Sequence, residues 1–293
     1  MNLYWPIYKS LESELIKLSY SIHFGDNHLD TYSIVCSNLI LRAAAEIESL
    51  SKELYLLNGG KPKKNLQYDF DAIKFLNKEW ELEHKIVLLT NSNFFFSKLE
   101  LTPFSKITKS DNHGKLTFLW NNAYQNLKHD RVNKYTFGNI RNLIEIMSAL
   151  FILNLYKKDE IKFLGEKKAS AVFDRKLESD IFSIKIFDPF VNEIHRDGLK
   201  NECTYKVKLT DKTIRENKLI EDHVIQQCKE HFKHSFMYID FMKENKGIEI
   251  TDELIIKLLE EEKFRALNQF KFHKSSERKI RQNFEAVPNK NCI

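Results

Sequence analysis

The chain has 293 residues, of which 42% are hydrophobic and 30% are charged, a balance typical of an ordinary globular protein. It contains only 8 glycines and 5 prolines, which argues against a sandwich or barrel built from many tight turns and favours helices. The net charge of +5 permits binding to a polyanion but does not by itself indicate it.

The sequence has no strong signal for a membrane or secreted protein. Its longest apolar run, residues 144–155, is interrupted by Glu145, Ser148 and Asn154 and is shorter than the ~20 residues that a membrane-spanning helix needs. The first residues carry too few apolar side chains for a signal peptide. The four cysteines are scattered without the spacing of a disulfide framework. We therefore expect a cytoplasmic protein with reduced thiols and no membrane partner.

Apolar residues recur at helical spacing through the first half of the chain. They predict helices over about 11–22, from Asp30 or Thr31 to Leu57, over 69–88, and from Thr136 to Tyr156. The last of these is apolar on almost every side, which predicts the central buried helix. Residues 91–114 are expected to be irregular, with their aromatic side chains covering the helix ends.

The composition changes after Tyr156, where charged residues predict a domain boundary. Partial alternation over 181–187 and clean alternation over 205–209 predict two or three short strands, and helical patterns return over 222–243 and 251–270. The sequence therefore predicts a mostly α fold. An up-and-down helical bundle would occupy residues 1–158, and residues 159–293 would form a C-terminal helical region that carries a small β element.

One stretch, Trp120 to Arg131, concentrates side chains that can do chemistry. On a helix, Asn122, Asn126 and His129 share one polar face opposite an apolar face. This places His129 among amides that can hydrogen-bond a ribose or a phosphate. A helix that continued through Arg131 would point that residue away from His129. A helix that ended at His129 or Asp130 would let the chain turn and bring the guanidinium back.

This stretch resembles the HEPN-like helical proteins of bacterial defence and stress loci. The resemblance includes Leu101-Thr102-Pro103-Phe104 before the stretch and Arg42-Ala43-Ala44-Ala45-Glu46 on an earlier helix, and it covers residues 10–157. It implies a metal-independent endoribonuclease, without a cofactor, in which two copies of the domain pair to build one site. RNA and a second copy of the chain are then the expected partners, with a defence-system protein or an antitoxin as a further one.

The resemblance also implies roles for individual residues. His129 would be the acid or base, since a histidine titrates near neutrality. Arg131 and Lys128 would bind phosphate, and Arg131 would stabilise the charge that develops on it. Asn126 would orient the substrate. His129, Arg131 and Asn126 form the expected catalytic set.

Two further residues, Asn122 and Glu46, join Lys128 in the expected substrate-binding set. Glu46 stands four residues after Arg42 on a predicted helix, so a structural ion pair between the two is the alternative to a role at the site.

The chain departs from the HEPN signature at one point. Members of that superfamily carry an arginine a few residues before the histidine, whereas this chain has Asn122, Ala123 and Tyr124 there. Either Arg131 substitutes from the other side of His129, or the protein binds RNA or another protein without cutting. The expected function is an endoribonuclease of antiphage defence or stress response, and the alternative is a non-catalytic binding module.

Two other patterns are weaker. His223, Cys228, His231 and His234 fall on one predicted helix, but only the last two have ligand spacing, so a solvated helix face is favoured over a zinc site and no metal is expected. Residues 271–281 interleave basic and apolar side chains, which fits either a grip on a phosphate backbone or a helix that docks on its own domain.

Overall fold

The structure is a computed structural model that describes residues 3–108, 116–166, 172–233 and 281–290, together with a few isolated positions between 239 and 254. The chain divides into two compact units, Met1–Lys208 with Phe284–Ile293, and Leu209–Asn283. Residues 159–208 belong to the larger unit, so the expected boundary after residue 158 falls inside it.

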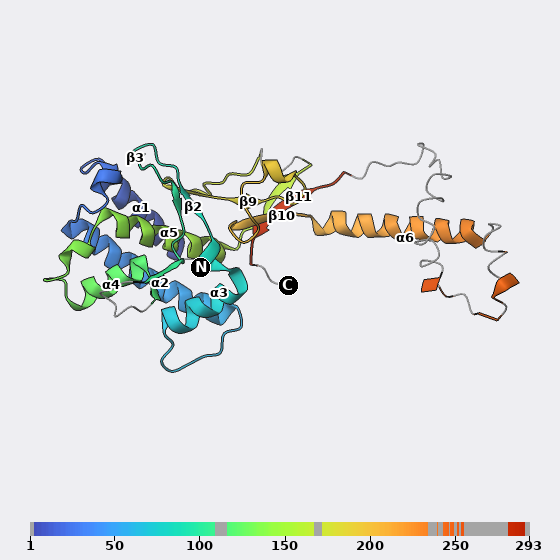
Figure 1. Cartoon of the computed structure of the whole chain (residues 1–293), viewed down its shortest axis with the longest axis horizontal. Helices are drawn as coiled ribbons and strands as arrows, with labels where there is room; N and C mark the ends of the chain where they lie inside the picture. Colours follow the sequence, from blue (N-terminus) through green and yellow to red (C-terminus); the bar gives the residue numbers. More distant parts are fainter. Residues whose placement is uncertain are drawn as a thin grey trace. The chain divides into compact units, whose positions relative to one another are not determined.

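The larger unit contains five described α-helices. α2 and α5 pack against each other, and both contact α1 and α4 (Figure 1). Almost every residue of α5 is buried, so the predicted central helix is confirmed. The helix bounds are α1 Tyr4–Ser19, α2 Ile34–Leu57, α3 Lys74–Trp80, α4 Leu119–His129 and α5 Ile140–Lys158.

The start of α2 differs from the expectation. The helix ends at Leu57 as predicted, but its N-cap is Ser33, whose hydroxyl accepts a hydrogen bond from the Cys36 amide at 3.0 Å. Neither Asp30 nor Thr31 caps it, because the preceding residues are held in an extended bridge to the segment before α5. Tyr32 pairs with Asn139 there, and this pairing joins two segments that are about a hundred residues apart.

The helix predicted over 69–88 is interrupted. A π-helical turn, η2 (Tyr68–Ile73), leads into the short helix α3, and Glu81 then adopts a left-handed conformation with φ of 50° that ends the helix. A 3-10 turn, η3 (Leu82–His84), follows, and the chain continues as strand β2. The apolar residues after Glu81 therefore lie in a sheet rather than on a helix face.

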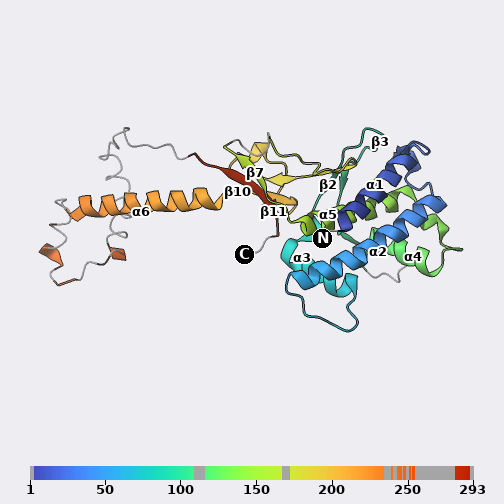
Figure 2. The ribbon, with the colours of Figure 1, turned by 180° about the vertical axis from the view of Figure 1, so that it is seen from behind.

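The described residues form four small sheets, so the prediction of a mostly α fold with one small β element is wrong. The fold is mixed α/β. The sheets are the parallel pair β1-β3, the three-stranded β4-β2-β8, the hairpin β5-β6 and the four-stranded β7-β11-β10-β9, part of which Figure 2 shows side by side. The strand bounds are β1 Phe24–Gly25, β2 Val87–Leu89, β3 Phe94–Phe95, β4 Glu100–Leu101, β5 Lys106–Thr108, β6 Leu116–Phe118, β7 Lys162–Gly165, β8 Phe182–Ile184, β9 Ile186–Phe187, β10 Tyr205–Leu209 and β11 Phe284–Pro288.

Most of these strands could not be predicted from the sequence, because each strand has only two to five residues. Such a run is too short for its alternation to be told from helical spacing. Their partners are also distant in sequence: Val87 of β2 pairs with Ile184 of β8. The region expected to be irregular, 91–114, contributes three of the strands, and the strands expected near 181–187 and 205–209 are present as β8, β9 and β10.

A buried carboxylate ties α1 to the segment before β8. Glu12 is fully buried and accepts hydrogen bonds from the Tyr8 hydroxyl at 2.9 Å and from the Asp180 amide at 3.1 Å, and it also contacts the Ser179 hydroxyl and Lys9. A buried charge is stable only when it is paired and hydrogen-bonded in this way.

The smaller unit contains α6, Asp211–Lys233, which begins earlier than the helix predicted over 222–243. The predicted helix over 251–270 and the basic tail 271–281 lie almost wholly outside the described residues. Three 3-10 turns complete the larger unit: η1 Asp26–His28, η5 Tyr135–Phe137 and η7 Glu193–His195. Across the described helices of the chain, none is long and apolar enough to cross a membrane.

Candidate functional site at the end of helix α4

The apolar face of α4 packs against the segment that precedes it. The Trp120 indole nitrogen donates a hydrogen bond to the Pro103 carbonyl oxygen at 2.8 Å, and the Trp120 ring stacks on Phe118 with ring centroids 5.5 Å apart. Phe104 contacts both rings edge-on. The two sequence segments that carry the family resemblance thus lie in direct contact.

Two amides of α4 bind a tyrosine on the π-helical turn. The Tyr68 hydroxyl donates to Asn121 Oδ1, and Gln125 Nε2 donates to the same hydroxyl at 3.1 Å. Burial raises the pKa of the Tyr68 hydroxyl well above its usual range. These hydrogen bonds hold α4 against η2 through two amides that are not among the predicted site residues.

Asn122 and Asn126 interact with each other. Asn126 Nδ2 donates to the Asn122 backbone carbonyl at 2.9 Å and lies 3.4 Å from Asn122 Oδ1. Asn122 is only 5% exposed, whereas Asn126 is half-buried. The amide nitrogen that was expected to orient a substrate is therefore engaged within its own helix.

The helix ends at His129, because Asp130 leaves helical geometry with φ of −149° and ψ of 58°. Asp130 organises the turn that follows: its carbonyl accepts from the Lys134 amide at 2.9 Å, and its carboxylate accepts from Asn133 Nδ2 at 2.9 Å. His129 and Arg131 are both exposed. Within the described part of the chain no hydrogen bond or ion pair joins these two groups, which share one helix end.

Lys128 lies over the ring of Tyr124, with Nζ 5.2 Å from the ring centroid. A hydrogen bond with the Tyr124 side chain raises the pKa of Lys128, and the charge of Glu48 adds to this effect. Lys128 is itself exposed and stays protonated at neutral pH, which suits a contact with phosphate.

Glu46 lies away from the end of α4. Arg42, expected to pair with it, instead places Nη1 2.7 and 2.8 Å from the two carboxylate oxygens of Glu14 on α1. Burial raises the pKa of Glu46, and Arg42 opposes the rise. The charge of Glu46 acts on Tyr4 of α1, while that of Glu48 acts on Lys128. The charge that acts on Lys128 at the end of α4 is thus that of Glu48, and not that of Glu46.

A hollow of about 390 Å³ lies between the start of α4 and the start of α5. Its wall contains an exposed tyrosine, three asparagines and an arginine. Of these residues, only Asn122 was predicted from the sequence as a site residue. Nothing in the local pattern of the others indicated a site, because they meet only when the extended bridge Tyr32–Asn139 forms. The lining residues are Asp30, Tyr32, Leu119, Asn122, Thr136, Phe137, Asn139, Arg141 and Asn142.

A carboxyl group on α5, Glu145, titrates near neutrality. Burial raises its pKa to about 7, against the opposing charges of Lys98 and Arg141. A carboxylic acid with such a pKa can take up or release a proton at physiological pH. In the sequence Glu145 stands out only as an interruption of an apolar run, because helical spacing does not show that its carboxyl is buried.

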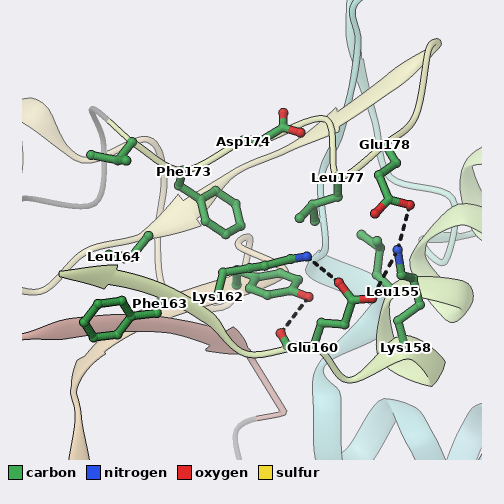
Figure 3. Close-up of a pocket in the computed structure, with 12 residues that line it drawn as sticks. Leu155, Lys158, Glu160, Lys162, Phe163, Leu164, Phe173, Asp174, Leu177 and Glu178 are labelled. Carbon is green, nitrogen blue, oxygen red and sulfur yellow. Dashed lines mark hydrogen bonds and ion pairs between the residues drawn. The ribbon is translucent and has the colours of Figure 1, made fainter.

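A second pocket, of about 250 Å³, lies beside β7 (Figure 3). Lys158 places Nζ 3.0 Å from Glu178 and 3.4 Å from Glu160, Lys162 pairs with Glu160, and the Tyr205 hydroxyl donates to the Glu160 carbonyl at 3.1 Å. Four of its charged groups, Lys158, Lys162, Glu160 and Glu178, are thus paired with one another, and Asp174 accepts from the Lys176 amide. None of the residues predicted for the site lies in it.

The structure describes little of the histidine cluster on α6. His234 and the side chains of Cys228 and His231 lie outside the described residues. In the parts of the chain that are described, no group of three or more His, Cys, Asp or Glu side chains could hold a metal ion.

No protein-family model matches the chain, and comparison with curated proteins and with solved structures finds no significant match. The resemblance to HEPN-like proteins therefore stays a prediction from the sequence.

Proposed function

We propose that the chain binds RNA at the end of α4 and cleaves it without a metal ion, as an endoribonuclease of antiphage defence or stress response. The observation that carries the proposal is the end of α4 at His129. Because the helix stops there, His129 and Arg131 do not point to opposite sides of one continuous helix. Both are exposed, and the proposal places one phosphodiester between them.

The proposed chemistry needs a proton-transfer group and a cation. His129 accepts the proton of a ribose 2′-hydroxyl while that oxygen attacks the adjacent phosphorus, or it donates a proton to the leaving 5′-oxygen. Arg131 binds the phosphoryl oxygens, where negative charge grows in the transition state. Lys128 adds a second positive charge to the same helix end.

A non-catalytic RNA- or protein-binding module is the second candidate. It is favoured by the engagement of Asn126 within its own helix and by the position of Glu46 on the α1 side of α2. With these two groups elsewhere, the exposed end of α4 retains cations that bind but fewer groups that position a reacting ribose.

Pairing of two copies belongs to the same proposal, because one exposed end of α4 supplies one histidine and two would supply the acid and the base. A cytoplasmic location and a defence-system or antitoxin partner are further parts of it. The described thiols of Cys36 and Cys203 are free and buried, which supports a reducing compartment.

The test is incubation of the pure protein with total RNA in EDTA, together with His129→Ala, Arg131→Ala and the control His84→Ala, which removes an exposed histidine near α3. Cleavage by wild type and control, with a loss of about 10²–10⁴-fold in His129→Ala, supports the enzyme. RNA binding without cleavage by any of the four proteins supports the binding module. Cleavage that His129→Ala retains in full rules out the proposed site.

A further inference from the structure

The hollow between α4 and α5 brings an aromatic ring, amides and a cation together. We propose that it binds one unpaired nucleobase of a single-stranded RNA, with Tyr32 stacking on the base. This inference rests on the proposed RNA binding and deepens it, because it assigns the kind of RNA and a subsite that holds it.

The stacking surface is Tyr32. Tyr32 lines the hollow, is 49% exposed and stands in the extended bridge just before α2. Tyr135 contacts Tyr32 with ring centroids 5.2 Å apart and an angle of 62°, and it is itself half exposed. An aromatic ring that is held in place but left open to solvent is the platform on which proteins stack unpaired bases.

The amides of the hollow are partly used for structure. Asn139 caps α5 by accepting from the Asn142 amide at 3.0 Å, and its own Nδ2 donates to the Thr136 carbonyl. Asn142 Nδ2 donates to the Phe137 carbonyl at 2.9 Å. The described side-chain hydrogen bond of Asn142 thus engages only Nδ2. The side-chain oxygen Oδ1 is left to accept from the N–H groups on a base edge.

The charges favour a nucleotide over an uncharged ring. Arg141 lines the hollow and pairs with Asp30 at 3.3 Å, and both side chains are exposed. Such an exposed ion pair contributes little to stability, so a phosphate can replace Asp30 as the partner of Arg141. The backbone amide of Arg141 donates to the Leu29 carbonyl and is therefore not available to an anion. In the proposal the Arg141 guanidinium makes the contact with the phosphate.

The turn that follows α4 leads along the chain into the wall of the hollow. Thr136 and Phe137 in its wall follow the turn that carries Arg131 and Lys134. Among the described residues, no ion pair involves either of these two cations. A strand whose base enters the hollow therefore has cations for its neighbouring phosphates. The volume of about 390 Å³ lies in the range of about 300–1,000 Å³ found for small-molecule sites. It accommodates one base but not a duplex.

The test uses a fluorescein-labelled RNA of about ten nucleotides, 2′-O-methylated so that the 2′-hydroxyl cannot attack. Its binding is measured by fluorescence anisotropy, single-stranded and annealed to its complement. We expect wild type to prefer the single strand by about tenfold and Tyr32→Ala to weaken binding by roughly 5–100-fold. Two controls should bind as wild type does. Tyr32→Phe keeps the ring, and Tyr20→Ala removes an exposed tyrosine at the C-terminal end of α1.

A 5-iodouridine crosslink to the peptide that contains Tyr32 would locate the base directly. Equal binding of duplex and single strand, wild-type affinity of Tyr32→Ala, or no binding by wild type each overturns the inference. The outcome is separable from catalysis. If binding depends on Tyr32 but unmethylated RNA is not cleaved, the base-binding subsite is supported and the nuclease activity is refuted. If RNA is cleaved but Tyr32→Ala binds with unchanged affinity, the nuclease activity is supported and the subsite is refuted.

Discussion

The indole nitrogen of Trp120 donates a 2.8 Å hydrogen bond to the carbonyl oxygen of Pro103. The bond joins α4 to the segment between β4 and β5, and it holds the helix whose last residue is His129. The stability of this contact therefore bears on the geometry of the candidate site.

Replacing Trp120 tests this contact in two steps. Trp120→Phe keeps an aromatic ring but removes the donor and should lower the free energy of unfolding by about 1–2 kcal/mol, because the buried carbonyl loses its partner. Trp120→Ala also opens a cavity and should lower it by about 3–5 kcal/mol. Urea denaturation measures both, and equal stability of wild type and Trp120→Phe would contradict the role of the hydrogen bond.

Gly138 is required by a close approach to α2. A methyl group added there would lie 1.9 Å from Ser37 Oγ and 3.0 Å from Ser37 Cβ, so Gly138→Ala should destabilise the protein by about 1–3 kcal/mol. The double variant Ser37→Ala/Gly138→Ala removes the nearest atom and should recover part of that loss. A thermal-denaturation cycle over the four proteins measures the coupling, and strictly additive effects would speak against the clash.

Glu145 should make stability depend on pH. Its folded-state pKa of about 7 is raised by burial above the ordinary value of 4.5, so the native state binds more protons than the unfolded state between these values. The contribution of protonated Glu145 to the free energy of unfolding is therefore fully present below pH 4.5, and it is lost as the pH rises through 7. Glu145→Gln should therefore be more stable than wild type at pH 8, by about 2 kcal/mol after allowance for partial exposure, and nearly equal at pH 4.

Urea denaturation across this range measures the difference between the two curves. Glu79→Gln, which removes an exposed carboxyl on α3, is the matched control and should give a curve parallel to wild type. A difference between Glu145→Gln and wild type that does not change with pH would show that Glu145 is not the titrating group.

Lys85 should act in the opposite direction at higher pH. Its side chain is fully buried, Nζ donates to the Asn201 carbonyl at 2.9 Å, and burial lowers its pKa from 10.5 to about 8. Between pH 8 and 10.5 the unfolded state binds more protons, so wild type should gain stability as pH rises, by about 2–3 kcal/mol. Lys85→Met should lack this gain, and the exposed Lys74→Met should keep it. Denaturation curves over this range decide the matter, and the prediction is refuted if Lys85→Met follows wild type.

Local sequence patterns predicted those elements whose stability comes from their own periodicity. The apolar sides of α5 identify it as the buried helix, and the glycines after Leu57 mark the end of α2. The possible end of α4 at His129 could also be foreseen. Strand β2 could not, because Glu81 and a partner in β8 decide that Val87–Leu89 leaves the helix.

The site divides in the same way. The sequence by itself determined that Asn122, Asn126 and His129 share one face of α4, since helical spacing alone places them there. Only the tertiary structure decided what surrounds that face: Tyr68 binds Asn121 and Gln125 on α4, and the bridge from Tyr32 to Asn139 builds the hollow that Asn122 lines. The physical reason is that these contacts join residues far apart in the chain, and no local period records which distant side chain fills a face.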